Sequence, residues 1–405
     1  METKATHIIH RLNLQVAVSS EAEARAWLQD SDTSLQSQWL ARVEKLLDQY
    51  SPVSRHIRLD QVSIQMTCTK REDWMDKALE ALKEKLDQLI QKESKATKYS
   101  EQEQLLDLFF AYLQQGRLPW YAPKLSGWDS KALIEAIMLA EQSCKQQLLD
   151  LLQKNNWTRF RIARQMELPV MQYLASLLLP LKVYKRISPV LGMDAPAWSN
   201  FWTHLDARHC TGQQDLVKAL EKDLWKELPA EPELQPLEMK QDQEVFVGNA
   251  GLVILHPFLQ QLFVQSGWVT EQKFIGLPEQ EKAVHLLHHL AGAELRDIEV
   301  HMEFEKYLCG LPIAYPLPRL KSLSPELQEE AEQLLQAVVK HWTALGNSSP
   351  AALQEGFLQR PGKLDASSGK LWVEQSGIDI LLEQLPWGIR TIKLPWLPEL
   401  LQVNW

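Results

Sequence analysis

The stretch SPELQEEAEQLLQAVVKHWTALG, residues 324–346, contains the clearest helix signal of the chain. Ser324 and Pro325 stand where a helix cap and a first helical residue belong, and Gly346 stands where the helix should end. Between them, apolar residues recur at helical spacing and form one stripe. The stripe consists of Leu327, Ala331, Leu334, Val338, Trp342 and Leu345. We therefore predict a long central helix in the core of a C-terminal region.

Downstream of this helix the pattern changes from helix to strand. The stretch GKLDASSGKLWVEQ, residues 362–375, contains two short strand-like segments around a Ser-Ser-Gly turn, and IRTIKL, residues 389–394, contains a third. We expect residues 366–369 to form an exposed loop. Residues 245–405 are thus predicted to form a domain that mixes helices with a small sheet.

The N-terminal region shows a different order of elements. Residues 7–18 alternate apolar and polar side chains, as a half-buried strand does, and a helical pattern follows up to Tyr50. A second strand is predicted over residues 57–66, although its apolar phase slips, which suggests a bulge or an irregular edge. Apolar residues at helical spacing over 75–89 then close a small β-α-β-α unit, residues 1–95.

The middle of the chain, residues 102–228, is helical in pattern throughout. Prolines divide it into short pieces, and these prolines are Pro119, Pro123, Pro169, Pro180, Pro189 and Pro196. The polar run 91–104 and the acidic, proline-rich run 228–244 are predicted to be the linkers on either side. The fold class that follows is α+β and predominantly helical, with three regions.

The composition limits the possible functions. The chain has a formal net charge of -9, which argues against a sequence-independent grip on nucleic acid or on an anionic membrane. The N-terminal residues have no apolar signal segment, so we expect the protein to stay in the cytoplasm. Four cysteines without a CxxC pair suit reduced thiols better than a disulfide framework.

No common catalytic motif occurs in the sequence, so we expect neither an enzyme nor a cofactor. The stretch AVHLLHHL places His285, His288 and His289 at the spacing of one helix face. They could bind a metal with a third ligand drawn from His256, His301 or His341. Alternatively, they donate hydrogen bonds to the backbone or to neighbouring side chains at a helix contact, which the surrounding leucines favour.

Tryptophan is unusually frequent, with 15 residues, and the tripeptide LPW occurs three times. A Pro-Trp step is a rigid anchor, because proline fixes its own φ angle and restricts the residue before it. Such an anchor can form a packed corner of the fold, or it can fill a pocket on a partner. The interface candidates are Trp120, Trp387, Arg390, Lys393, Trp396 and Trp405.

Several stretches together resemble one known family, the tape measure proteins of extracellular contractile injection systems, which are phage-tail-like particles of bacteria. The N-terminal IHRLNLQV and GRLPW, residues 116–120, are similar to the family's opening strand and first LPW. The C-terminal stretches that carry the resemblance are VGNAGLVILHPFLQQLF (247–263), KAVHLLHHLA (282–291), KYLCGLPI (306–313), EAEQLLQAVVKHWTALGNSSPAALQEGFLQRPGKL (330–364) and DILLEQLPWGIRTIKLPWLPELLQVNW (379–405).

The resemblance implies a non-enzymatic structural component that acts in tail assembly or in setting tail length. It implies tail tube, sheath, baseplate or tail-cap proteins as partners, not nucleic acid or membrane, and it leaves a homo-oligomer open. The protein would be made in the cytoplasm and then join the particle. With 21 prolines, however, the chain suits compact domains better than an extended ruler. The alternatives are a metal-binding domain built on His285 and His288, and a cytosolic helical adaptor.

Overall fold

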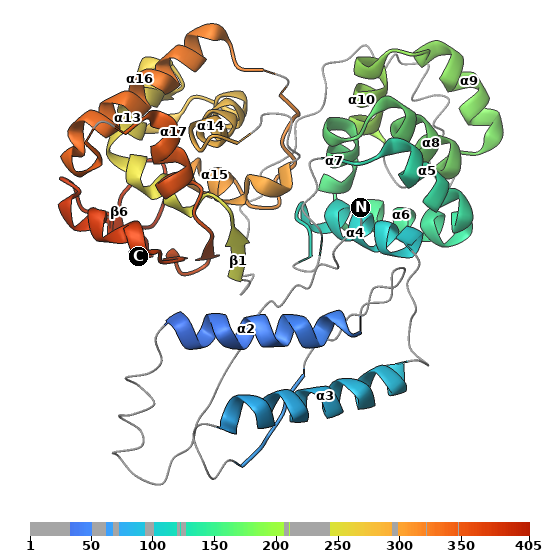
Figure 1. The fold of residues 1–405 in the computed structure, drawn as a ribbon. Coiled ribbons are helices and arrows are strands. Elements are labelled where there is room, and N and C mark those ends of the chain that lie inside the picture. Colours follow the sequence, from blue (N-terminus) through green and yellow to red (C-terminus); the bar gives the residue numbers. More distant parts are fainter. Residues whose placement is uncertain are drawn as a thin grey trace. The chain divides into compact units, whose positions relative to one another are not determined.

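A computed structural model of the chain describes residues 33–50, 62–67, 73–93, 101–119, 122, 127–205, 210, 244–293, 299–320, 322–346 and 348–405. The chain separates into two compact units, Met1–Asp107 and Leu108–Trp405 (Figure 1). The finer division into three regions stays a prediction. None of the described helices has the length and apolar character that crossing a bilayer requires.

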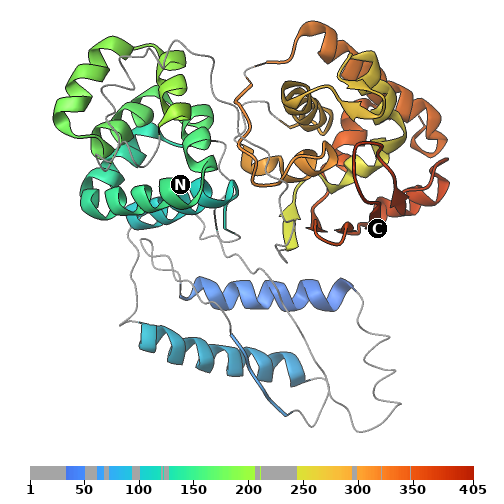
Figure 2. The ribbon, with the colours of Figure 1, turned by 180° about the vertical axis from the view of Figure 1, so that it is seen from behind.

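The first unit contains two helices that pack side by side, α2 (Thr33–Asp48) and α3 (Trp74–Glu93) (Figures 1 and 2). The rings of Trp39 and Trp74 meet at a centroid distance of 5.4 Å. Residues 62–67, the described part of the second predicted strand, form no β-strand with other described residues, although half-buried apolar side chains alternate there with exposed polar ones. The first predicted strand lies outside the described residues, so the pairing of the two strands stays a prediction.

The linker predicted at residues 91–104 is wrong at both of its ends. Helix α3 continues to Glu93, and α4 (Glu101–Gln115) begins before the predicted linker has ended. Glu101 and Glu103 lie in the first turn of α4, where carboxylates interact favourably with the helix dipole. The polar composition of residues 91–104 therefore covers the end of α3 and the start of α4 as well as the connection between them.

The middle region forms short helices, as predicted from the spacing of its prolines. After α4 these helices are α5 (Ser130–Leu139), α6 (Glu141–Lys154), α7 (Trp157–Gln165), α8 (Leu168–Leu178), α9 (Leu181–Leu191) and α10 (Ala195–His204). Pro169 and Pro196 lie in first turns, where the missing N–H costs no helical hydrogen bond. Pro189 is a correction, because it lies inside α9 and does not end it.

The predicted central helix is α16 (Pro325–His341), and the Ser324 side chain accepts a hydrogen bond from the N–H of Leu327. The α-helix ends earlier than predicted, because Trp342 leaves helical geometry at φ -91° and ψ 83°. A 3₁₀ turn, η5 (Thr343–Leu345), leads from there to Gly346, which has a φ of +59°. The stripe is nevertheless confirmed as core, since Trp342 is completely buried and Leu345 is buried as well.

The other α-helices of the C-terminal region contribute residues to the same hydrophobic core as α16. The α-helices are α13 (His256–Gln265), α14 (Leu277–Leu290), α15 (Glu303–Leu308) and α17 (Pro350–Leu353). The shorter turns are η3 (Ala250–Leu255), η4 (Glu299–His301), η6 (Gln354–Leu358) and η7 (Gly377–Gln384).

A five-stranded sheet completes this region, with the strand order β1-β4-β5-β7-β6. Its strands are β1 (Glu244–Val247), β4 (Gly362–Asp365), β5 (Lys370–Val373), β6 (Thr391–Ile392) and β7 (Leu401–Asn404). Strands β5 and β7 run parallel, and the other pairs are antiparallel. A separate two-stranded hairpin joins β2 (Val269–Thr270) to β3 (Lys273–Phe274). Strands β4, β5 and β6 were predicted from the sequence, whereas β1 and β7 were not.

The turn between β4 and β5 is held by Asp365, whose carboxylate accepts hydrogen bonds from the hydroxyls of Ser367 and Ser368. Both serines are exposed, as predicted for this loop. Gly369 departs from the prediction because it is buried. A Cβ atom at this position would lie 2.7 Å from the carbonyl oxygen of Leu400, so only glycine fits there.

Along these strands, buried residues alternate with exposed ones. Val245, Leu364, Leu371 and Val403 are in register across the sheet and belong to the core. Helices packed on one face of a small mixed sheet, together with the helical middle, confirm the predicted class, a predominantly helical α+β fold.

Candidate functional site

The second LPW of the chain is fastened to the start of α13. The indole N–H of Trp387 donates to the carbonyl of Ile254 at 3.0 Å, and its ring meets the ring of Phe258 edge-on at 5.2 Å. A ring nitrogen of His256 lies 3.0 Å from the carbonyl oxygen of Gly388, the residue after Trp387. This tripeptide therefore forms a packed corner.

The third LPW is fastened near the other end of the same helix. The indole N–H of Trp396 donates to the carbonyl of Leu308 at 2.7 Å. Its ring packs against Phe263 of α13 at 5.4 Å and against Phe274 at 5.1 Å. The two tripeptides thus hold α13 at two points, and the chain between them carries β6.

Trp405 makes a corner of a different kind. Its indole N–H donates to Asp379 Oδ2 at 3.0 Å, and the other oxygen of this carboxylate accepts from Arg360 at 2.8 Å. Asp379 also accepts the backbone N–H of Ser376 and so caps η7. One carboxylate therefore ties the C-terminal residue to the core of the same region.

Arg390 and Lys393 lie on either side of β6, and both are exposed. Within the described part of the chain, neither side chain makes an ion pair or a hydrogen bond. Trp387, Trp396 and Trp405 are half-buried, so part of each residue remains accessible to solvent. The corner contacts are therefore established, while the role of these residues in an interface stays a prediction. Trp120 lies outside the described residues.

Three buried charged residues of the described chain meet where α7 contacts the C-terminal region. Arg161 Nε lies 2.7 Å from Glu299 Oε1, and Lys306 Nζ lies 3.0 Å from Glu299 Oε2. All three side chains are buried, and the backbone N–H of Leu317 and the hydroxyl of Tyr112 also donate to Glu299. Burial alone would raise the pKa of Glu299, but Lys306 and Arg161 outweigh it, so the pKa lies below its usual value.

The same helix reaches the segment 314–317 through further hydrogen bonds. Arg161 donates to the carbonyl of Ala314, and Gln165 donates to the carbonyl of Leu317 at 2.8 Å. Arg164 pairs with Glu281 at 2.6 Å and donates to the carbonyl of Pro316 at 2.9 Å. These contacts join the helical middle to the C-terminal region inside the second unit. None of these contacts was predicted from the sequence.

Two histidines of the AVHLLHHL stretch, His285 and His288, bind protein groups. A ring nitrogen of His285 lies 2.9 Å from the carbonyl oxygen of Pro318, and His288 Nδ1 lies 2.8 Å from Glu305 Oε1, which Asn249 also contacts. Burial lowers the pKa of His285 to about 4, so its ring stays neutral. These contacts confirm, for His285 and His288, the prediction of hydrogen bonds to the backbone or to a neighbouring side chain. Among the described residues, no three metal-ligating side chains gather into a site.

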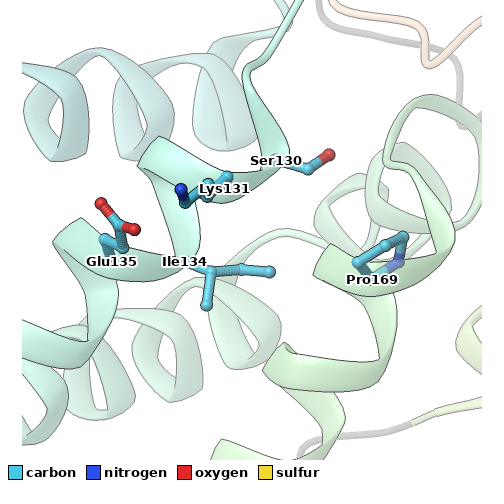
Figure 3. A pocket seen from close by; sticks show the side chains of 5 residues that line it. All are labelled: Ser130, Lys131, Ile134, Glu135 and Pro169. Carbon is cyan, nitrogen blue, oxygen red and sulfur yellow. The ribbon is translucent and has the colours of Figure 1, made fainter.

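A surface hollow of about 370 Å³ lies between the starts of α5 and α8 (Figure 3). Ser130, Lys131, Ile134 and Glu135 of α5 line it together with Pro169 of α8. Ser130 Oγ donates to Glu167 at 2.6 Å, which fastens the two helix starts together. The hollow is open to solvent and presents mainly apolar surface to it.

In the part of the chain that the structure describes, buried charges and indoles fasten one element to another. The comparisons identify the class of protein. The family model of the contractile injection system tape measure protein matches residues 6–228 and 207–405, and the chain belongs to this family of tail components. Neither a curated protein nor a solved structure matches it.

Proposed function

We propose that this protein acts in assembly of the tail of a contractile injection system and binds tail tube, sheath, baseplate or tail-cap proteins. The observation that carries this proposal is the family match, which extends over nearly the entire chain. The protein would be made in the cytoplasm and then join the assembled particle. Tail length would depend on this protein because tails would not assemble normally without it.

The proposal favours a compact component over a ruler that spans the tube. A continuous helix of 405 residues would be about 600 Å long at 1.5 Å per residue. The longest described helix, α3, has 20 residues, which corresponds to about 30 Å. Short helices and a shared core support a role at a tail end or in assembly, because a folded body of this size measures only tens of ångströms.

We place the contact with the particle on the C-terminal anchor segment, residues 385–396. The two tryptophans of this segment are fixed by the corner contacts, so binding would cost little side-chain entropy. Tryptophan and arginine are favoured in the centres of interfaces. The exposed Arg390 and Lys393 would orient an acidic surface of the partner.

Affinity purification of particles tests this assignment. The double variant Arg390→Glu with Lys393→Glu should fold normally, because both side chains are exposed, but it should no longer co-purify with particle subunits. The matched control is Lys273→Glu with Lys340→Glu, which makes the same change in net charge at other exposed positions. Equal recovery of both variants with particles would refute the proposed contact.

A further inference from the structure

Residues 313–318 belong to no helix or strand, and side chains hold their backbone in place. We call these residues the strap. Five of its six carbonyl oxygens accept a hydrogen bond from a side chain. The donors, in the order of the strap, are Lys306, Arg161, Arg164, Gln165 and His285. The strap therefore lacks the ladder of backbone hydrogen bonds that holds a helix or a sheet.

The side chains that hold the strap come from both parts of the second unit. Arg161, Arg164 and Gln165 lie on α7 of the helical middle. Lys306 lies on α15 and His285 on α14, both in the C-terminal region. Because each of these contacts is made by a side chain, the strap can leave α7 without breaking a helix or a strand. Segments held in this way open locally, at a lower free energy than the whole fold.

Lys306 and Glu299 connect the strap to the buried charges. The ammonium of Lys306 lies 3.0 Å from Glu299 Oε2 and 3.1 Å from the carbonyl oxygen of Ile313. The same Glu299 oxygen accepts the backbone N–H of Leu317 at 2.8 Å. One buried cation and one buried carboxylate thus fix the strap near each of its ends. A change that draws Lys306 away would loosen the strap.

Glu303 is a buried carboxyl placed to draw Lys306 away. It lies three residues before Lys306 on α15, at the spacing of neighbours on a helix surface. Glu303 is only 8% exposed, and no described cation lies within ion-pair distance of its carboxyl. Burial raises the pKa of Glu303 to about 8, so this group keeps its proton at neutral pH.

The charged groups that face Glu303 come from α15 and from the end of α4. Lys306 and Glu305 lie on α15 itself, and Arg117 follows α4. The Glu305 carboxylate already lies 2.8 Å from His288 Nδ1. An ionised Glu303 would be repelled by Glu305 and attracted by the two cations, Lys306 and Arg117.

We propose that the strap is a releasable joint between the helical middle and the C-terminal region, and that loss of the Glu303 proton releases it. An ionised Glu303 would compete with Glu299 and with the carbonyl of Ile313 for the ammonium of Lys306. Release would also return the new charge to water, which is favourable for a buried carboxylate without a close partner. The inference does not depend on the proposed role in tail assembly.

The population of the released state should increase between about pH 6.5 and about pH 8. In that state Glu303 is solvated and its pKa returns to about 4.3, so release gives up a proton at any pH between the two values. His285 acts in the opposite direction, because its pKa is lowered to about 4 in the fold and returns to about 6.5 on release. The two effects oppose each other below about pH 6.5, and only that of Glu303 remains above it.

Hydrogen exchange of the full chain, followed by mass spectrometry, tests the inference. The unchanged protein is compared at each pH with Glu303→Gln, which has nearly the same shape but cannot ionise. The intrinsic pH dependence of exchange cancels in the ratio of the two exchange rates. For peptides that cover the strap, this ratio should rise by up to about tenfold per pH unit between pH 6.5 and pH 8 and level off above.

The matched control for this comparison is Glu383→Gln, which changes an exposed glutamate and should exchange like the unchanged protein at every pH. A ratio for the strap that stays constant over the window would overturn the inference. Equal protection of the strap and of α16 would overturn it as well, because the whole fold would then open together.

The variant Arg117→Gln tests whether Glu303 controls the release. It removes a cation that favours the charged form of Glu303, so the rise of strap exchange with pH should continue to a higher pH. Circular dichroism and thermal unfolding show that the variant folds. A purely structural loss at Arg117 would raise strap exchange by the same factor at every pH. That result, with the rise ending at an unchanged pH, would contradict control by Glu303.

Discussion

Arg161 on α7 and Glu299 in η4 form an ion pair at 2.7 Å with both side chains completely buried, although 138 residues separate them in the sequence. Lys306 and the N–H of Leu317 use the second oxygen of the same carboxylate. A buried charge is tolerated only where partners replace water. This cluster therefore fixes how the helical middle meets the C-terminal region within the second unit.

Replacing Arg161 with Met should reduce the free energy of unfolding by about 3 to 5 kcal/mol, because Glu299 would keep its charge without its closest partner. Urea unfolding followed by circular dichroism measures this loss. The control Arg390→Met removes an exposed arginine and should change stability by less than about 0.5 kcal/mol. Similar values for the two variants would show that the buried pair does not hold the two parts together.

Trp342→Ala should reduce the free energy of unfolding by about 3 to 5 kcal/mol. The whole indole is buried against Phe357, and its N–H donates to the carbonyl of Leu381. Trp372→Ala is the matched control, since Trp372 lies on β5 and is 38% exposed. Its loss should be clearly smaller. If Trp342→Ala left thermal unfolding nearly unchanged, the α16 stripe would not be part of the core.

Substitutions at Trp396 distinguish a structural role in a packed corner of the fold from a role in binding a partner. Trp396→Phe keeps an aromatic ring beside Phe263 and Phe274 but leaves the carbonyl of Leu308 without its donor, so we expect a loss of about 1 to 2 kcal/mol. Trp396→Ala should cost about 3 kcal/mol or more. Thermal unfolding and co-purification with particles are measured on the same preparations. A folded Trp396→Phe that no longer joins particles would show that the indole is an anchor, whereas unchanged co-purification would leave only the corner role.

Glu303 should make stability decrease as pH rises from about 4.3 to about 8. Burial raises its pKa to about 8, so the folded protein keeps the proton that the unfolded chain releases near pH 4.3. The contribution of this group to stability is therefore full below about pH 4.3 and decreases as pH rises to about 8. His285, with a pKa lowered to about 4, changes stability only below about pH 6.5, so the two effects can be separated.

The variant Glu303→Gln tests this dependence. Between pH 6.5 and pH 8, the unfolding free energy of the unchanged protein should fall relative to that of the variant by up to about 1.4 kcal/mol per pH unit. Denaturant unfolding at several pH values measures the difference. Parallel curves for the two proteins over this window would show that Glu303 is already ionised in the fold.

The local elements of the C-terminal region could be predicted because their signals lie within short windows. The α16 stripe and the turn at Asp365 depend on neighbouring residues only, and both were found. Strand β7 was missed because its four residues gain their structure from a parallel partner about 30 residues away. The position of β7 depends on contacts with distant residues, which the sequence of β7 alone does not predict.

The candidate site shows the same limit. The LPW pattern identified the residues that hold α13, but it could not separate a corner from an anchor, since both roles use the same rigid tryptophan. The buried cluster around Glu299 was missed, because an arginine in α7 and a glutamate in η4 look like ordinary surface residues until distant segments enclose them. A useful signal would have been Arg161 between Phe160 and Ile162 on a short helix.

Electron microscopy of particles from cells with and without the gene is the most direct test of the assembly role. Tail lengths are measured in both strains and in a deletion strain that carries the gene on a plasmid. A tail-assembly protein predicts that tails are lost or uncontrolled in length without the gene and are restored by the plasmid. Normal numbers of particles with unchanged tail lengths in the deletion strain would contradict the role proposed for this protein.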